Sequence, residues 1–204
     1  MKVNIEIQIL KRIKKAKRGV LFFNDSFIAF GSSDAVRQAL ARLVKAGELD
    51  RVATGIYTNP EIDPVIGKVM PSLEKIAETI AKRDKARIIP TGAYALYRLG
   101  LTTQIPLNVV YLTDGAARKI KIGNRSITFK KISPKNVATV GEISGLVIQA
   151  LRTIGKDNAR NDEIAKIQEL LKKEKRTRLE HDYRLAPAWI RIIINPVLKS
   201  MAND

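Results

Sequence analysis

The sequence predicts an α+β protein in which an N-terminal winged helix-turn-helix precedes a mixed α/β C-terminal domain. Residues 1–60 show the pattern of helix, short helix, helix and hairpin, and short strands alternate with helices after Pro60. A hydrophobic fraction of 45% is ample for packed cores, which excludes a disordered basic chain. We expect a winged helix-turn-helix over 1–60, a proline-flanked linker over 61–71, and the second domain, with a helical C-terminal end, over 72–204.

The N-terminal elements follow from apolar spacing and capping residues. Isoleucines four residues apart predict a first helix over 3–16, and polar capping residues before an apolar run predict a short helix over 27–30. A serine cap and a terminating glycine flank a longer helix over 33–46. Two short strands around a central glycine then predict a hairpin over 49–58, which is the wing.

The helix over 33–46 has the two faces that a recognition helix requires. Its apolar residues are spaced to pack on the preceding helices, and Arg37, Gln38 and Arg42 lie opposite them with side chains that match base edges. The alternative is a small helical domain whose polar residues only face solvent. The residues expected to contact DNA are Ser33, Arg37, Gln38, Ala41, Arg42, Lys45, Arg51, Thr54, Lys14, Lys15, Lys17 and Arg18, the last four from the basic cluster over 11–18.

The second domain contains a basic hairpin in which cations alternate with apolar residues, which predicts one buried and one cationic face. We expect the cationic face to contact phosphates beside the DNA site, to meet an acidic partner, or only to face solvent. Its cations are Arg118, Lys119, Lys121, Arg125, Lys130 and Lys131. The expected elements are helix 72–83, strand 87–89, helix 91–99, strand 108–113, hairpin 119–131, helices 142–154 and 162–182, and a last helix from Pro187 that Asn195-Pro196 interrupts.

The charge of the chain points to a polyanionic partner. The 37 Lys and Arg residues outnumber the 20 Asp and Glu residues, for a formal net charge of +17. Net charges of +6, +8 and +3 in residues 1–60, 61–140 and 141–204 place the positive charge on folded segments throughout. Nucleic acid is the expected partner. No signal-peptide region or apolar run of about 20 residues occurs, so we expect a cytoplasmic protein without a membrane partner.

Two motifs have residues that occur in catalytic sites. The Gly-Ser-Ser-Asp run at 31–34 resembles the start of a nucleotidyltransferase signature, but no Asp-x-Asp or Asp-x-Glu pair follows at a suitable spacing, so a helix cap explains it better. His181 lies between two acidic residues that point in different directions on a helix. With no cysteine and one histidine, we expect neither a metal nor a cofactor. Carboxylates gathered from distant positions, Asp63, Glu74, Asp84 and Asp114, would still allow a magnesium-dependent nuclease.

Two segments resemble the abortive-infection type E (AbiEi-like) antitoxins. The winged-helix pattern of that family is similar to Gly31-Ser32-Ser33, Val36, Ala39-Leu40, Arg42–Gly47, Leu49, Arg51-Val52, Gly55–Tyr57 and Pro60. The start of the family's C-terminal domain is similar to Ala93–Thr102 followed by Val109–Thr113. The resemblance covers about two thirds of the chain. The order and spacing of the two segments make it more specific than either motif alone, and the tail from residue 160 fits no family pattern.

The resemblance implies a transcriptional repressor that autoregulates a type IV toxin–antitoxin operon, not an enzyme. Family members bind double-stranded DNA, typically at inverted repeats in their own promoter, and antagonise a nucleotidyltransferase-like toxin, often without a stable complex. The family's C-terminal domain carries the antitoxin activity. Two other classes remain open at this point: a metal-dependent enzyme that processes nucleic acid, and a basic RNA-associated structural protein.

Overall fold

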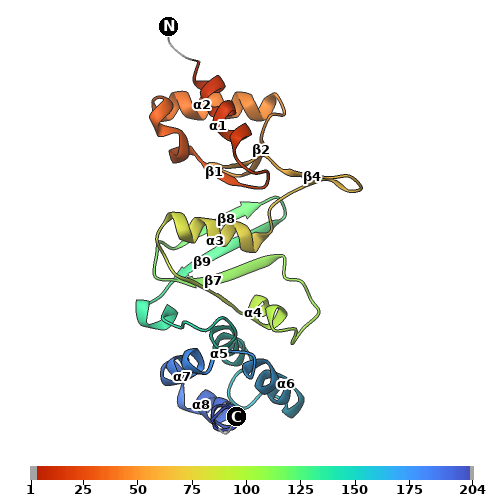
Figure 1. Cartoon of the computed structure of the whole chain (residues 1–204), viewed down its shortest axis with the longest axis vertical. Helices are drawn as coiled ribbons and strands as arrows, with labels where there is room; N and C mark the ends of the chain where they lie inside the picture. The colour runs from red at the N-terminus through yellow and green to blue at the C-terminus, as the bar shows by residue number, and fades with distance from the viewer. Residues whose placement is uncertain (1–3, 203–204) are drawn as a thin grey trace. The chain divides into compact units, whose positions relative to one another are not determined.

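The α+β architecture predicted from the sequence is confirmed by a computed structural model, which describes residues 4–202 (Figure 1). The chain divides into two units. The first runs to Thr79 and includes Ile120–Ile122, and the second contains Ile80–Lys119 and the chain from Gly123 onward. The boundary falls inside α3 (Leu73–Arg83), which is a continuous helix. Within residues 4–202, no helix is long and apolar enough to cross a membrane.

The first unit has the element order and sheet topology of a winged helix-turn-helix. Its sheet is antiparallel in the order β1-β3-β2, so β1, which precedes the helical pair, lies beside the second wing strand. The expected first helix began at residue 3, which lies outside the described residues. The elements are α1 (Ile5–Lys15), β1 (Leu21–Phe23), the 3₁₀ helix η1 (Asn24–Phe30), α2 (Ser33–Lys45), β2 (Asp50–Ala53) and β3 (Ile56–Thr58).

Helix α2 is held by its caps and by one apolar face. The hydroxyl of Ser32 accepts a hydrogen bond from the backbone N–H of Ala35 at 3.3 Å, and Gly47 follows the last turn with a φ of +75°. The same helix contributes Val36 and Leu40 to a core that also contains the fully buried Ile9 of α1. Burial of this face therefore fixes which side of α2 faces outward.

The segment 61–71, expected as a linker, folds instead as a hairpin of β4 (Glu61–Asp63) and β5 (Gly67–Val69). One oxygen of the Asp63 carboxylate accepts hydrogen bonds from the backbone N–H groups of Val65 at 2.8 Å and Ile66 at 3.0 Å. These bonds lower the pKa of Asp63. The Asp63-Pro64 pair therefore builds a tight turn, and the sequence signal for a loop was correct only at the hairpin tip.

After α3 the chain forms a four-stranded sheet in the order β6-β7-β9-β8, followed by helices; all of these elements belong to the second unit except the end of β8, Ile120–Ile122. β6 runs antiparallel to β7, and β7 runs parallel to β9. The elements are β6 (Ile88–Thr91), α4 (Ala93–Arg98), β7 (Asn108–Thr113), β8 (Arg118–Ile122), β9 (Arg125–Lys131), the 3₁₀ helix η2 (Pro134–Val137), α5 (Glu142–Ile154), α6 (Asn161–Leu171), α7 (Arg176–Leu185) and α8 (Ala188–Ser200).

The C-terminal helices differ from the sequence prediction in two places. The single helix expected over 162–182 is two helices, α6 and α7, with the buried Glu174 between them. The last helix is not interrupted, because α8 continues through Pro196. Proline removes a helical hydrogen bond, but α8 buries Ile190 and Ile194 completely, and this packing keeps the helix continuous.

Two buried carboxylates from later in the chain cap the start of α5. Asp182 of α7 is fully buried, and its Oδ1 accepts a hydrogen bond from the backbone N–H of Val140 at 2.9 Å. Its Oδ2 accepts one from the N–H of Gly141 at 2.9 Å and one from the hydroxyl of Ser144 at 2.6 Å. Glu174 accepts another backbone N–H of the first turn at 2.8 Å. These bonds satisfy donors that have no partner within the helix.

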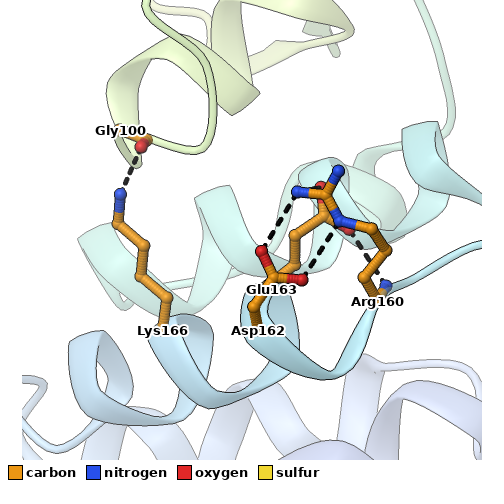
Figure 2. A network of polar contacts seen from close by, with 5 residues as sticks. All are labelled: Gly100, Arg160, Asp162, Glu163 and Lys166. Atoms are coloured by element: carbon orange, nitrogen blue, oxygen red, sulfur yellow. Dashed lines mark hydrogen bonds and ion pairs between the residues drawn. The ribbon is translucent and has the colours of Figure 1, made fainter.

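Polar contacts hold the first turn of α6 and join α6 to the turn after α4 (Figure 2). Lys166 of α6 donates a hydrogen bond to the carbonyl of Gly100, the residue with positive φ that follows α4. Arg160 donates to the carboxylate of Asp162 through two side-chain nitrogens at 3.1 Å, which lowers the pKa of Asp162. The backbone N–H of Arg160 also donates a hydrogen bond to the carboxylate of Glu163 at 3.0 Å. The tail that matched no sequence pattern is therefore an integral part of the second unit.

Candidate nucleic-acid interface

The outward face of α2 carries all six of the α2 residues expected to contact DNA. Each is exposed, whereas the residues between them, such as Leu40 and Leu43, are buried. A helix of 3.6 residues per turn produces this separation from the sequence spacing alone. The structure thus brings together on one exposed surface Ser33, Arg37, Gln38, Ala41, Arg42 and Lys45.

Two of the three base-reading candidates on α2 form ion pairs. Arg37 pairs with Asp34 one turn earlier, and Arg42 pairs with Glu6 of α1. Gln38 has no side-chain hydrogen bond among residues 4–202. Exposed ion pairs of this kind contribute only about 0–1 kcal/mol, so a base edge or a phosphate can replace the carboxylate at small cost. The pair to Glu6 does, however, direct Arg42 towards α1.

The basic cluster over 11–18 does not form one uniform surface. Lys14 lies 3.4 Å from a carboxylate oxygen of Glu48, and Arg18 donates to the carbonyl of Pro60 at 3.3 Å. Arg12 lies over two aromatic rings of η1, 5.7 and 5.9 Å from their centroids. Lys15 and Lys17 are exposed, and neither forms an ion pair within the described part of the chain. The same holds for Lys11, so Lys11, Lys15 and Lys17 are the cations of this cluster that remain available to phosphates in the described part of the chain.

The wing is short. β2 and β3 are joined through Thr54 and Gly55, and Gly55 has a φ of +73°, which favours glycine at this turn. Both Arg51 and Thr54 are exposed, as a wing contact requires. Arg51 lies opposite Tyr57 in the strand register and forms no ion pair among the described residues. Arg51 is therefore the single wing cation available to a phosphate in this part of the chain.

The second basic surface expected on the β8–β9 hairpin is not continuous. Arg118 is half-buried, pairs with Asp84, and lies 5.4 Å from the ring centroid of Phe129. Burial, and then the charge of Arg83, lower the pKa of Arg118. Arg118 is therefore a structural residue and not part of an exposed surface. The other five cations, Lys119, Lys121, Arg125, Lys130 and Lys131, are exposed, but they lie towards opposite ends of the strands.

Three of the four carboxylates considered for a magnesium site have other partners in the structure. Asp84 and Asp114 bind arginines, and Asp63 caps its own turn. In residues 4–202 no group of three or more His, Asp or Glu side chains is placed to hold a metal ion. His181 is exposed, and its Nδ1 lies 2.9 Å from Oδ1 of the buried Asp182. His181 therefore contacts the carboxylate that caps α5.

An open groove of about 630 Å³ lies in the first unit beside the end of α1. Four of its charged side chains form ion pairs, Lys14 with Glu48 at 3.4 Å and Lys68 with Asp50 at 2.9 Å. The fifth, Arg18, donates a hydrogen bond to the carbonyl of Pro60. The Lys68 contact joins the β4–β5 hairpin to β2. The ion pairs along the groove therefore connect α1 with the segment after α2, and β5 with β2. Sequence spacing could not predict these pairs, because their members lie 34 and 18 residues apart.

The carboxyl of Asp114 makes the stability of the second unit pH-dependent. Its pKa is lowered, chiefly because the backbone N–H of Arg87 donates to it at 2.7 Å, and the Arg87 guanidinium adds to this effect. A depressed folded pKa stabilises the protein above the unfolded pKa of about 3.9, and this stabilisation is lost as the pH falls through the folded value. We expect Asp114→Asn to melt below the wild type at pH 7 and to approach it below about pH 4. Thermal melts from pH 7 to 2.5 check this, and an equal difference in Tm at both ends would contradict it.

Comparisons with known proteins match the chain to one protein family. The family model is described as a family of unknown function (DUF6088) and matches residues 8–179, from within α1 to within α7. Among solved structures, the chain is similar to the crystal structure of the RV2827C protein from Mycobacterium tuberculosis, with 12% sequence identity, a TM-score of 0.45, and coverage of 95% of this chain and 81% of that chain. No curated protein matches the chain.

Proposed function

Because the chain belongs to DUF6088, a family of unknown function, we propose its function from its own residues: it is a DNA-binding transcriptional repressor that reads its own promoter through α2. The observation that carries the proposal is the exposed face of α2 in the α1-β1-η1-α2-β2-β3 order. In a winged helix-turn-helix this face enters the major groove. Arg37 and Gln38 have the donors and acceptors to read guanine and adenine edges, and the exposed Ala41 lets the helix approach closely.

The phosphate contacts come from cations around that face. Lys45 ends α2, Arg51 lies in the wing, Lys15 ends α1 and Lys17 follows it; all four are exposed and form no ion pair in residues 4–202. Each neutralised phosphate releases condensed counterions, which makes affinity depend on salt with a logarithmic slope of about −0.9 per contact. A DNA-binding role in the cytoplasm also accounts for the net charge of +17.

The proposal extends to an antitoxin. Its support is the resemblance of two segments to the abortive-infection type E antitoxins, in which repression and toxin antagonism occur in one chain. The repressor would bind inverted repeats and autoregulate an operon that also encodes a nucleotidyltransferase-like toxin. Co-expression with the product of the neighbouring gene should restore growth. Failure of the full-length chain to rescue growth would remove the antitoxin part and leave a DNA-binding regulator.

Promoter binding is expected to weaken steeply with salt. Four phosphate contacts from the first unit predict a slope of about −3.6 or steeper, so affinity for the chain's own promoter should fall at least roughly 150-fold between 50 and 200 mM salt. Electrophoretic shifts or fluorescence anisotropy with the promoter duplex measure the slope. A random duplex of equal length is the control and should bind more weakly. Equal affinity for both duplexes, or insensitivity to salt, would contradict the proposal.

A further inference from the structure

One end of the sheet in the second unit collects cations from segments far apart in the chain. Because β7 and β9 are parallel and β6 is antiparallel to β7, Ile88 at the start of β6, Thr113 at the end of β7 and Lys131 at the end of β9 lie in one row. Residues just outside this row gather at the same end. They come from 82–87 before β6 and from 114–119, which leads from β7 into β8.

Two carboxylates hold these segments together. Asp114 accepts hydrogen bonds from the backbone N–H and the Nε of Arg87, at 2.7 and 2.9 Å. Asp84 accepts from Nε of Arg83 at 2.8 Å and pairs with Arg118. The loops are also close enough that a Cβ on Gly115 would lie 2.7 Å from the Cβ of Ala86. The sheet end is therefore a defined surface in which both carboxylates are already occupied by arginines.

The charge that remains at the sheet end is carried by lysines. The three segments 82–87, 114–119 and 130–131 contain eight cations and two carboxylates. Five lysines among them are exposed and form no ion pair in the described part of the chain. We call these five residues the sheet-end cluster: Lys82, Lys85, Lys119, Lys130 and Lys131. The alternation of the β8–β9 hairpin marks Lys119, Lys130 and Lys131 as exposed cations, but only the tertiary structure, through the Asp84–Arg118 pair, adds Lys82 and Lys85 at the same end of the sheet.

We propose that the sheet-end cluster is a second nucleic-acid site, which binds the phosphates of double-stranded DNA irrespective of sequence. Lysine ammonium groups act as point charges for phosphate, whereas the arginines that would read bases here are held by Asp84 and Asp114. Binding of single strands relies on exposed aromatic rings, and the aromatic residue at this end, Phe129, is buried beneath Arg118. The site goes beyond the proposed function, since it stands whether or not α2 reads a promoter.

The test compares two full-length variants that each lose four positive charges. The first carries Lys82→Gln, Lys119→Gln, Lys130→Gln and Lys131→Gln. The control carries the same change at four exposed lysines of the helical part of the unit, Lys156, Lys173, Lys175 and Lys199. Binding to a random-sequence DNA duplex is measured between 50 and 200 mM salt. Four lost phosphate contacts should reduce the logarithmic salt slope by about 3.6, and affinity at 50 mM salt by more than tenfold, in the first variant only.

Equal slopes for the two variants would overturn the proposal, and so would a larger loss of affinity for single-stranded RNA than for duplex DNA. If the fourfold variant melts below the wild type, the pairs Lys82→Gln/Lys119→Gln and Lys130→Gln/Lys131→Gln are used instead, each with about half the change in slope. The preference for promoter over random duplex should be unchanged in every sheet-end variant. A lost preference for the promoter would contradict base reading by α2, whereas an unchanged salt slope would contradict phosphate binding by the sheet-end cluster. The two proposals can therefore be tested separately.

Discussion

Replacing Arg37 and Gln38 together by alanine is expected to remove most of the preference for the promoter over a random duplex. Both side chains lie on the exposed face of α2, and truncation at exposed positions leaves the buried face intact. A bidentate contact to a base contributes about 1–3 kcal/mol of discrimination, so two of them predict a loss of at least roughly 30-fold in the affinity ratio. Competition binding with the two duplexes measures that ratio directly.

The matched control for this variant is Lys45→Gln on the same helix. Lys45 is exposed at the last turn of α2 and is expected to contact a phosphate. Its loss should weaken binding to the promoter and to the random duplex equally and reduce the salt slope by about 1. A preserved promoter preference in Arg37→Ala/Gln38→Ala would mean that α2 is not the recognition helix. A loss of preference in Lys45→Gln alone would mean that the base and phosphate roles are reversed.

The largest expected effect on stability is that of Asp182→Ala. The side chain of Asp182 is fully buried and accepts hydrogen bonds from two backbone N–H groups and the Ser144 hydroxyl. Alanine would leave these donors buried without acceptors at the start of α5, which costs about 1–3 kcal/mol per unsatisfied group. We expect the free energy of unfolding to fall by about 3–5 kcal/mol, measured by urea denaturation.

The exposed Asp162→Asn provides the comparison. Asp162 binds Arg160 at the surface, and its loss should change the free energy of unfolding by less than about 0.5 kcal/mol. Asp182→Asn is expected to lie between the two, because an amide keeps one acceptor but presents its NH₂ group to existing donors. A loss for Asp182→Ala as small as that for Asp162→Asn would show that the α5 cap does not contribute to folding.

The difference between the sequence prediction and the structure is clearest among the charged residues. Spacing correctly placed Arg37 and Arg42 on the exposed face of α2, since helical periodicity is a local property. It could not show that Arg42 pairs with Glu6, 36 residues away, or that Arg118 is half-buried against Asp84. The break between α6 and α7 was missed for the same reason, because no glycine or proline marks it and the buried Glu174 lies there to cap α5.

The sequence by itself determined the order of elements in the winged helix, the two faces of α2 and the excess of positive charge, because caps, turns and helical periodicity act over a few residues. Only the tertiary structure decided which cations are free. Asp34, Glu48, Asp84 and Asp114 form ion pairs with cations that the sequence alone left available. The parallel register of β7 and β9 places Lys131 at one end of the sheet, and the Asp84–Arg118 pair holds the segment that carries Lys82 at the same end. Such pairings depend on the packing of distant segments, which local patterns do not encode.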